Sequence, residues 1–385
     1  MVSCGRIETF RPPQPIRDDL LESWSMPLFD VGEVAEILQT RGSMARLTVA
    51  TDRGSRRAIA FEVLTGKLNV GDRVLLNATA VELGLGTGGE DFVVCNLDAP
   101  YSGSLSGGHI LKMRYTAGQI DTFVSEAPES LHHDRFVEAT SAGGIPVVAC
   151  GLHSQIAPVA AVAKYLNPDL RIAYVMTDGA ALPIQLSDLV AALVDRKVIA
   201  GTVTCGHAFG ADVEAVNVFT GIIAAAQVLE ADLAIVAMGP GIVGTGTALG
   251  HTGMEQGQVI NASSALGSPS VAALRISFAD PRERHRSVSH HSLNALRYGT
   301  QSRCTIAVPE LEAEKLQSVM DDITAAGLMD IHDIRVIDAG QTEQALESFG
   351  LEPTTMGHSV SDDPEFFRAS GAAGIAALGL LTEGR

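Results

Sequence analysis

From Ile145 onward the chain alternates between short apolar runs and longer amphipathic stretches, and this alternation restricts the fold more than any other feature. The apolar runs are rich in Val, Ile and Ala, which is typical of strands buried on both faces of a sheet. Strands are predicted near Pro146–Cys150, Arg171–Met176, Ile199–Cys205, Leu233–Met238, Val271–Phe278, Cys304–Val308 and Ile334–Ile337. Helices are predicted near Ile156–Leu166, Leu186–Arg196, Val213–Leu229, Met254–Leu266, Val288–Tyr298, Leu311–Ala326 and Thr342–Ser348. Repeated strand–helix units predict an α/β domain with a doubly wound, mostly parallel sheet of the Rossmann-like class over residues 145–385.

The first part of the chain has a different pattern. Residues 1–30 contain Pro12, Pro13 and Pro15 and few apolar repeats, so we expect a leader there. Residues 31–100 contain short alternating runs separated by turn-forming residues, which predicts a small all-β barrel. Its strands are expected at Arg46–Thr51, Arg57–Val63, Arg73–Ala80 and Phe92–Asn96. Residues 101–144 begin with a Ser/Gly-rich stretch and are expected to form a connector.

A small barrel of this kind has two interpretations. It could bind oligonucleotides, or it could serve as a docking or oligomerisation module. Only Phe61 and Phe92 could act as stacking platforms, whereas binding of single strands uses several aromatic side chains and a basic groove. The docking interpretation is therefore favoured.

Composition limits the partners and the compartment. The 385 residues carry a net charge of −18, which repels nucleic acid and anionic membranes, so neither is expected as a partner. No apolar run reaches the roughly 18–20 residues that span a bilayer, and the first residues lack the apolar core of a signal peptide. The five cysteines form no C-x-x-C pair, as expected for reduced thiols, so a cytoplasmic location is predicted. The Ala/Gly-rich helices and buried strands allow a homodimer.

A glycine-rich loop directly follows the predicted strand Leu233–Met238. Such loops let the backbone approach a ligand closely, and threonine hydroxyls add hydrogen-bond donors. The loop residues expected to bind a ligand are Gly239, Gly241, Gly244, Thr245, Gly246 and Thr247. The spacing of the first three glycines matches the dinucleotide fingerprint, which leaves NAD(P) as an alternative cofactor. Against it, the next residues are too glycine-rich to open a helix, and the next acid, Asp280, lies 36 residues after Gly244 rather than about 20.

Polar residues follow each of the first five predicted strands. Ligands of such sheets bind outside the carboxyl ends of the strands, so these residues are expected to share one crevice. Asp178 and His207 are the candidates for acid–base work, or for binding a divalent metal if there is one, with His153 and His251 in support. Ser154 is a ligand-binding candidate, although a serine there can also cap the following helix, as can Ser287.

Arginines dominate the loop after the fifth strand. Arg282, Arg284 and Arg286 stand close together in a chain that is otherwise acidic. Two of them could bind a carboxylate or phosphate through their planar guanidinium groups. The alternative is a surface patch of ion pairs with Asp280 and Glu283. His290 and His291 fall within a predicted helix, where one of them is expected to pack or to lie at the surface.

Six segments carry a resemblance to a known family. They are GGHILKMRYT (107–116), ACGLHSQIAPV (149–159), YVMTDGAALP (174–183), TCGHAFGADVEAVNV (204–218), MGPGIVGTGTALGHTGMEQG (238–257) and SFADPRERHRSVSHHS (277–292). Through them the chain resembles domain-of-unknown-function family 3866. The resemblance implies a bacterial, intracellular protein and supplies no activity.

The function is therefore predicted from the residues alone. We expect an enzyme that acts on a small anionic molecule, either phosphorylated or nucleotide-like, with the glycine loop and Arg284 and Arg286 binding the anion. Two alternatives stay open at this point. One is an NAD(P)-dependent oxidoreductase, and the other is a non-catalytic protein that binds a metabolite and passes the signal to a partner through the barrel.

Overall fold

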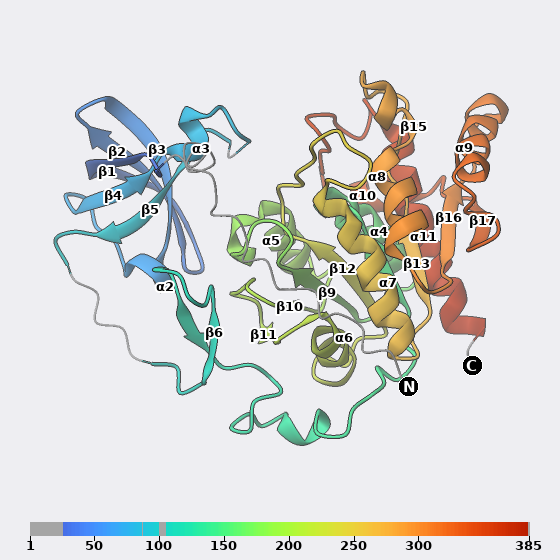
Figure 1. Cartoon of the computed structure of the whole chain (residues 1–385), viewed down its shortest axis with the longest axis horizontal. Coiled ribbons are helices and arrows are strands. Elements are labelled where there is room, and N and C mark those ends of the chain that lie inside the picture. Colours follow the sequence, from blue (N-terminus) through green and yellow to red (C-terminus); the bar gives the residue numbers. More distant parts are fainter. Residues whose placement is uncertain (1–25, 87, 100–104, 384–385) are drawn as a thin grey trace, which may run out of the picture. The chain divides into compact units, whose positions relative to one another are not determined.

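The computed structural model describes residues 26–86, 88–99 and 105–383. The chain divides into two compact units, one of Met1–Thr40 and Ala45–Tyr101 and the other of Arg41–Met44 and Ser102–Arg385 (Figure 1). The first contains a closed barrel and the second an α/β fold, as the sequence predicts. Most of the expected leader, including its three prolines, lies outside the described residues.

The barrel has five strands in the order β1-β2-β3-β5-β4. They are β1 (Phe29–Arg41), β2 (Met44–Thr51), β3 (Gly54–Phe61), β4 (Arg73–Asn77) and β5 (Asp91–Asn96). The sequence pattern did not predict β1. Most of its side chains are exposed and only Gly32 and Val34 are buried, so the strand lacks a hydrophobic face that alternates with a polar one.

The barrel core is built from the inward-facing residues of the strands, among them Leu47, Val49, Val74 and Leu76. Phe61 is 4% exposed and its ring stacks on Phe92 with centroids 6.5 Å apart. Because it is buried, Phe61 presents no free face for a nucleic-acid base. Two predicted strands end earlier than expected, because the chain turns into the short helices α2 (Glu62–Thr65) and α3 (Thr79–Glu82).

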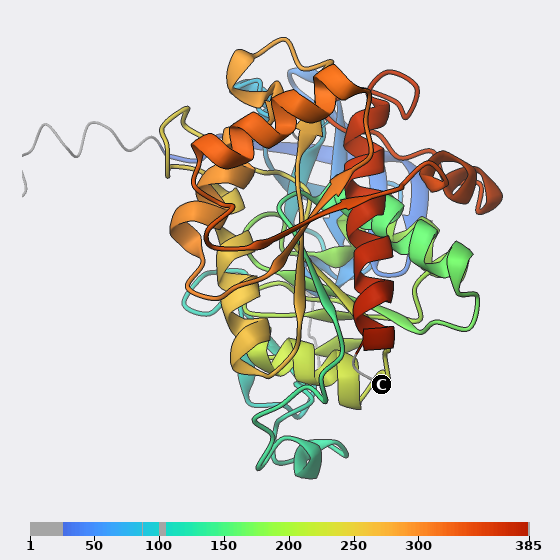
Figure 2. The ribbon, with the colours of Figure 1, turned by 90° about the vertical axis from the view of Figure 1, so that its right-hand side faces the viewer.

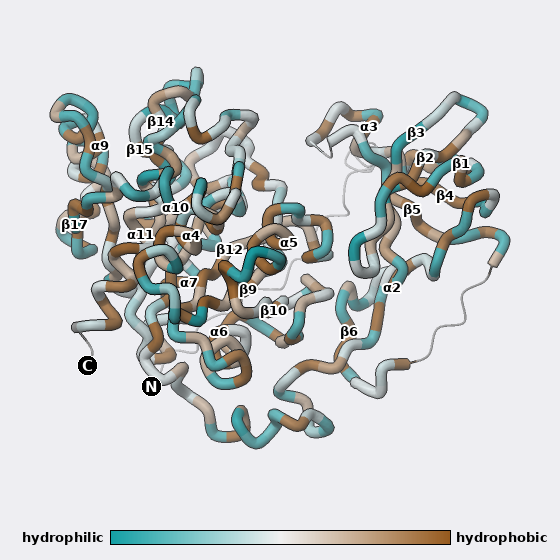
Figure 3. Tube along the Cα trace, turned by 180° about the vertical axis from the view of Figure 1, so that it is seen from behind, coloured by the Kyte–Doolittle hydropathy of each residue, from teal (hydrophilic) through white to brown (hydrophobic). Residues whose placement is uncertain are grey.

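The α/β unit is centred on eight parallel strands in the order β11-β10-β9-β12-β8-β13-β16-β17. Their bounds are β8 (Val147–Cys150), β9 (Ile172–Thr177), β10 (Gly201–Thr204), β11 (Val213–Glu214), β12 (Leu233–Met238), β13 (Ser270–Ala273), β16 (Thr305–Pro309) and β17 (Asp333–Ile337). Every residue of the central strands β8, β9 and β12 is buried. Figure 3 shows brown, hydrophobic segments along these strands. The predicted doubly wound, parallel sheet is confirmed.

Alternate residues along each strand enter two separate cores. Val148, Tyr174 and Ile235 pack on one side of the sheet, whereas Ala149, Val175 and Val236 pack on the other. The first side is covered by α4 (Ile156–Leu166), α5 (Asp188–Asp195), α10 (Thr342–Ser348) and α11 (Pro364–Glu383). The second side is covered by α6 (Val218–Gln227), α7 (Glu255–Ala265) and α9 (Ala313–Ala325). Figure 2 shows α11 in red and α7 in yellow on opposite sides of the sheet.

Three predicted elements differ from the structure in ways that affect the site. The expected strand Val271–Phe278 breaks at Leu274–Arg275 into β13 and β14 (Ile276–Ser277), and β14 pairs with β15 (Ser287–Val288). The expected helix Val288–Tyr298 is instead α8 (His290–Asn294) followed by a π-helical turn, Ala295–Gly299. The expected helix Val213–Leu229 begins with the short edge strand β11, so its helical part starts only at Val218.

The connector contains an antiparallel pair, β6 (Ile110–Lys112) and β7 (Ile120–Thr122). The side chain of Lys112 is fully buried, and its Nζ lies 3.2 Å from a carboxylate oxygen of Glu214. The same Nζ donates to the backbone carbonyls of Ala215 and Thr204. These contacts attach the connector to the edge of the parallel sheet.

None of the helices within the described ranges is both long enough and apolar enough to cross a membrane.

Candidate functional site

The carboxyl ends of β8 and β12 are neighbours in the sheet, and the chain leaves them toward opposite faces, into α4 and α7. Crevices at such positions are the usual ligand sites of α/β sheets. A pocket of about 520 Å³ lies there. Its lining includes Leu152, His153, Ser154, Gly239, Gly241 and Ile242, together with a segment before α11, Gly350–Met356.

His153 lies in the first turn after β8 and is held on both sides of its ring. Its Nε2 is 2.7 Å from the Ser187 hydroxyl, and its Nδ1 is 3.2 Å from the Met238 carbonyl oxygen. The Tyr174 hydroxyl lies 3.3 Å from the same Nδ1. Burial lowers the pKa of His153 to about 4, so the imidazole is neutral at pH 7. His153 therefore borders the pocket as a fixed, uncharged ring.

Ser154 borders the pocket and does not cap the following helix. Its hydroxyl donates to the Thr355 hydroxyl at 3.2 Å. The turn is held instead by Gln155, whose side-chain oxygen accepts from the backbone N–H groups of Gly151 and Leu152. Ser287 does not cap a helix either, because it lies in β15 and Ser289 caps α8.

Asp178 and His207 come together through the backbone. The N–H of His207 donates to Asp178 Oδ2 at 2.8 Å, and Gly206 leaves room for that carboxylate, since a Cβ there would lie 2.2 Å from it. Glu255, at the start of α7, approaches the same turn, because a Cβ on Gly179 would lie 2.6 Å from its carboxylate. Burial, with a smaller contribution from the like charge of Asp178, raises the pKa of Glu255 to about 6.

The glycine loop divides between the pocket and a hairpin. Gly239 and Gly241 line the pocket, and Gly239 must be small because a Cβ there would lie 2.5 Å from the Ala181 carbonyl oxygen. Gly244 pairs with His251 across the hairpin, and a Cβ on it would lie 3.1 Å from the His291 ring. The hairpin thus connects the pocket to a second group of residues.

The residues at the tip of the hairpin form hydrogen bonds with one another. The Thr245 N–H donates to the Gly250 carbonyl, and the Thr245 hydroxyl lies 3.0 Å from the Thr247 hydroxyl. Thr245, Gly246 and Thr247 are all exposed, and none of them lines the pocket. The helical turns that lead into α7 begin only at Thr252, so Gly239, Gly241 and Gly244 do not open a helix as the dinucleotide fingerprint does.

The arginines have two different environments. Arg282 makes two hydrogen bonds to Asp280, at 3.0 and 2.8 Å, and buried Arg275 makes another to the same carboxylate at 2.6 Å. These guanidinium groups, Arg282 first, hold the pKa of Asp280 far below its usual value. Arg284 and Arg286 are exposed, and within the described ranges neither makes an ion pair. The ion-pair alternative therefore holds for Arg282, while Arg284 and Arg286 are available to an anion.

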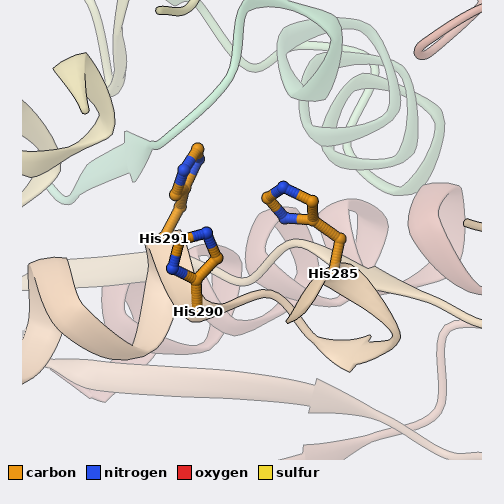
Figure 4. Close-up of side chains that lie close together, drawn as sticks. All are labelled: His285, His290 and His291. Carbon is orange, nitrogen blue, oxygen red and sulfur yellow. The ribbon is translucent and has the colours of Figure 1, made fainter. Parts of the chain in front are cut away.

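Four histidines gather beside this loop. His285 lies in the 3₁₀ turn before β15, His290 and His291 begin α8, and His251 ends the glycine hairpin. Ring centroids are 4.9 Å apart for His285–His290 and for His285–His291, and 4.3 Å for His290–His291. His251 stacks on His291 at 3.9 Å. One nitrogen from each of His285, His290 and His291 can be chosen so that all three lie within 4.8 Å of one another. Figure 4 shows these three side chains entering the same space.

The histidine cluster is neutral at pH 7 and incompletely hydrogen-bonded. Burial, followed by the charge of Arg275, lowers the pKa of His285 to about 4, and burial with the neighbouring His251 lowers that of His291 to about 3. Nδ1 of His285 lies 2.8 Å from the Ser289 hydroxyl and 3.2 Å from Arg275 Nη1. Nε2 of His290 and Nδ1 of His291 are buried without a hydrogen-bond partner in the described part of the chain.

The pocket and the cluster adjoin. A small cavity of about 10 Å³, close to the volume that holds one water molecule, is lined by His291, Arg275 and Gly253. Leu152 and Ile242 line both this cavity and the larger pocket. The carboxyl edge of the sheet therefore carries two neighbouring polar centres.

The sequence pattern predicts a site at this edge but does not predict that the histidines lie together. The sequence predicts that one of His290 and His291 packs or lies at the surface, and it predicts no role for Glu255. One signal is present in the sequence: three histidines fall between residues 285 and 291, in the loop and the start of the helix that follow a predicted strand. The residues expected to hold a metal, Asp178 and His207, belong to no group of three ligand side chains within the described ranges, whereas His285, His290 and His291 do.

Comparison with known proteins identifies the family of the chain but assigns it no activity. A search of curated proteins finds no match. A family model described as a protein of unknown function, DUF3866, matches residues 57–374. The match takes in β4, β5 and most of β3 of the barrel and nearly all of the α/β unit, whereas β1 and β2 precede it. The chain belongs to the DUF3866 family.

Proposed function

We propose that the α/β unit is an enzyme that binds a small anionic molecule at the carboxyl edge of its parallel sheet. The observation that carries the proposal is the pocket of about 520 Å³ at the ends of β8 and β12, where the following helices leave to opposite faces. A pocket of this size suits a metabolite, since small-molecule sites are about 300–1,000 Å³.

Two exposed arginines support an anionic ligand. Arg284 and Arg286 stand in the loop after β14 and make no ion pair with the described residues. Arg284 is close enough to His290 to lower the pKa of that imidazole, after burial and His251. Arginine in such a position binds carboxylate or phosphate oxygens in a bidentate manner. Neither arginine lines the pocket, so in this proposal the ligand extends beyond the pocket toward the arginine-rich loop.

Groups suited to proton transfer border the same edge. Glu255, whose pKa is about 6, could accept a proton at neutral pH, and the neutral His153 could accept or donate a hydrogen bond. Shifted carboxyl and imidazole pKa values in one crevice are common in enzymes. These features favour catalysis over simple storage of a ligand.

A thermal-shift screen tests the proposal. The panel contains mononucleotides, sugar phosphates, coenzyme A, dicarboxylates, and NAD and NADP. A ligand at a hundredfold excess over its Kd stabilises the folded chain by about 2.7 kcal/mol. We expect a phosphorylated compound to raise the Tm of the wild type and to lose most of this effect in Arg284→Ala.

The matched control is Arg297→Ala, which removes an exposed arginine from the π-helical turn after α8. It should retain the full shift. Absence of any stabilising anion, or equal loss in both variants, would contradict the proposal. If a compound stabilises the chain but is not converted in a subsequent turnover assay, the non-catalytic metabolite-binding alternative is favoured.

A further inference from the structure

We propose that His285, His290 and His291 form a binding site for a divalent transition metal, of which Zn²⁺ is the representative probe. The proposal goes beyond the small-anion pocket, because none of the three histidines lines that pocket.

The chain positions the three imidazoles with few degrees of freedom. Ser289 is fully buried and caps α8 by accepting from the His291 N–H, which fixes the first turn of the helix that carries His290 and His291. His285 is 2% exposed and is held by Ser289 and Arg275. Preorganised side chains of this kind reduce the entropy lost on binding an ion.

The distances suit one ion after small side-chain rotations. Zn–N bonds of about 2.0–2.1 Å place two ligand nitrogens of a tetrahedral site about 3.4 Å apart. The candidate nitrogens already lie within 4.8 Å of one another. Rotation about the side-chain torsions can close the remaining gap without moving the backbone.

Two of the three imidazoles have a buried nitrogen without a hydrogen bond to any described residue. Nε2 of His290 and Nδ1 of His291 have no partner in the described ranges, and a buried nitrogen without a partner destabilises the fold unless it gains a ligand. Nδ1 of His285 accepts from Arg275 in the structure, since a guanidinium group only donates, so the proton of this imidazole lies on Nε2. Binding of a metal at Nε2 therefore requires the other tautomer, in which Nδ1 gives up the bond from Arg275 and donates to the Ser289 hydroxyl. The Ser289 hydroxyl would then take the place of the carboxylate, carbonyl or water that commonly accepts from the second nitrogen of a ligand histidine.

The charges around the cluster are mixed, because, after burial, Arg275 and Arg282 lower the pKa of His285 and so oppose a further positive charge there. Asp280 accepts from both Arg275 and Arg282, so it neutralises part of their charge near the cluster. Three imidazoles leave a fourth coordination position open for water or for an anionic ligand, as in catalytic zinc sites. Imidazole ligands favour Zn²⁺, Cu²⁺ and Ni²⁺ over Mg²⁺ and Ca²⁺.

His251 is a packing neighbour in this proposal and not a ligand. Its ring stacks on His291 with planes 12° apart, so the two rings lie face to face instead of directing their nitrogens at a common point. It limits the rotation of His291 and shields one face of the cluster.

Titration of the full-length chain with Zn²⁺ tests the site. After removal of metals with a chelator, calorimetry should detect one Zn²⁺ per chain. His290→Ala and His285→Asn should each raise the Kd at least tenfold. The asparagine keeps a polar group near the position of Nδ1 and removes Nε2. The matched control is His132→Ala, which breaks the other adjacent histidine pair, His132-His133, outside the cluster.

A second measurement does not depend on the folding of any variant. Co²⁺ added to the wild type should give the intense visible absorption of a four-coordinate site, and Zn²⁺ should abolish it by displacement. No binding by the wild type, unchanged binding in folded cluster variants, or an equal loss in His132→Ala would overturn the assignment. None of these results depends on the small-anion pocket, because Zn²⁺ alone is the probe.

Discussion

The imidazole rings of His251 and His291 stack with centroids 3.9 Å apart and planes 12° from parallel. His251 ends the glycine hairpin that follows β12, whereas His291 lies in the first turn of α8. Gly244 makes this contact feasible, since a Cβ there would lie 3.1 Å from the His291 ring. The stack therefore links the glycine loop and the arginine-rich loop at one edge of the sheet.

Replacing His251 with phenylalanine should be tolerated. Neither nitrogen of His251 makes a hydrogen bond of good geometry with the described residues, so phenylalanine removes polar atoms that gain little from folding. The aromatic stack with His291 can be retained. We expect the free energy of unfolding of His251→Phe to stay within about 1 kcal/mol of the wild type, and that of His251→Ala to fall by about 2 kcal/mol.

Urea unfolding at pH 7 measures both variants. The same phenylalanine variant should bind Zn²⁺ like the wild type, because His251 is not a ligand in the proposed site. A phenylalanine variant as unstable as the alanine variant would show that the nitrogens of His251 matter to folding.

Removing Lys112 should strongly destabilise the α/β unit. Its fully buried Nζ lies 3.2 Å from Glu214, and burial already raises the pKa of that carboxyl. Lys112→Met would leave a buried carboxylate unpaired, which costs about 3–5 kcal/mol. The double variant with Glu214→Gln should recover part of the loss, since it removes the unpaired charge. Equal stability of the single and double variants in urea unfolding would show that the ion pair is not the cause.

Acid should destabilise the fold through His153. Burial lowers the pKa of this imidazole from 6.5 to about 4, so between these values the unfolded chain binds more protons than the folded chain. Stability is therefore retained above pH 6.5 and falls as the pH drops toward 4. At pH 5 the loss from this group is up to about 2 kcal/mol.

Comparing His153→Gln with the wild type isolates this contribution. The difference in unfolding free energy between pH 7 and pH 5 should be smaller in the variant, because glutamine does not titrate. An unchanged pH dependence would mean that His153 is not responsible. The other buried histidines remain in both proteins and cancel in the comparison.

Glu255 should have the opposite pH dependence. Burial, followed by the charge of Asp178, raises its pKa from 4.5 to about 6, so its ionisation costs more in the folded chain. The resulting stability is highest below pH 4.5 and is lost as the pH rises through 6. Glu255→Gln should therefore stabilise the fold at pH 7, by up to about 2 kcal/mol, with less effect at pH 4.5.

If Glu255 also transfers protons in the proposed enzyme, the same variant should lose turnover while its Tm rises. Such opposition between stability and activity is common at active sites. A variant that is less stable at pH 7 than the wild type would contradict the role of burial in shifting the Glu255 pKa.

Much of the fold was predictable from local pattern. The strand Leu233–Met238 and the helices Ile156–Leu166 and Thr342–Ser348 have the predicted bounds, because buried strands and amphipathic helices carry their signal within a few residues. β1 was missed because few of its side chains enter the barrel core. The break between β13 and β14 was missed because Leu274 and Ile276 continue the apolar run, although the chain turns at Arg275 to let that side chain reach Asp280.

The site was predictable in position but not in composition. The rule that ligands bind at the carboxyl ends of parallel strands located the edge where His153, Gly239 and Gly241 now line a pocket. The stacking of His251 on His291 depends on a hairpin that returns His251 to the start of α8, and that contact has no periodic signal in the sequence. Long-range side-chain contacts of this kind follow from tertiary packing and not from local pattern.

Anomalous diffraction at the zinc absorption edge, from crystals of the full chain soaked in Zn²⁺, tests most directly whether this edge of the sheet is the functional centre. The account predicts one strong peak within bonding distance of ring nitrogens of His285, His290 and His291. A strong peak elsewhere in the chain would contradict it. So would the absence of a peak in crystals where no neighbouring molecule covers the cluster.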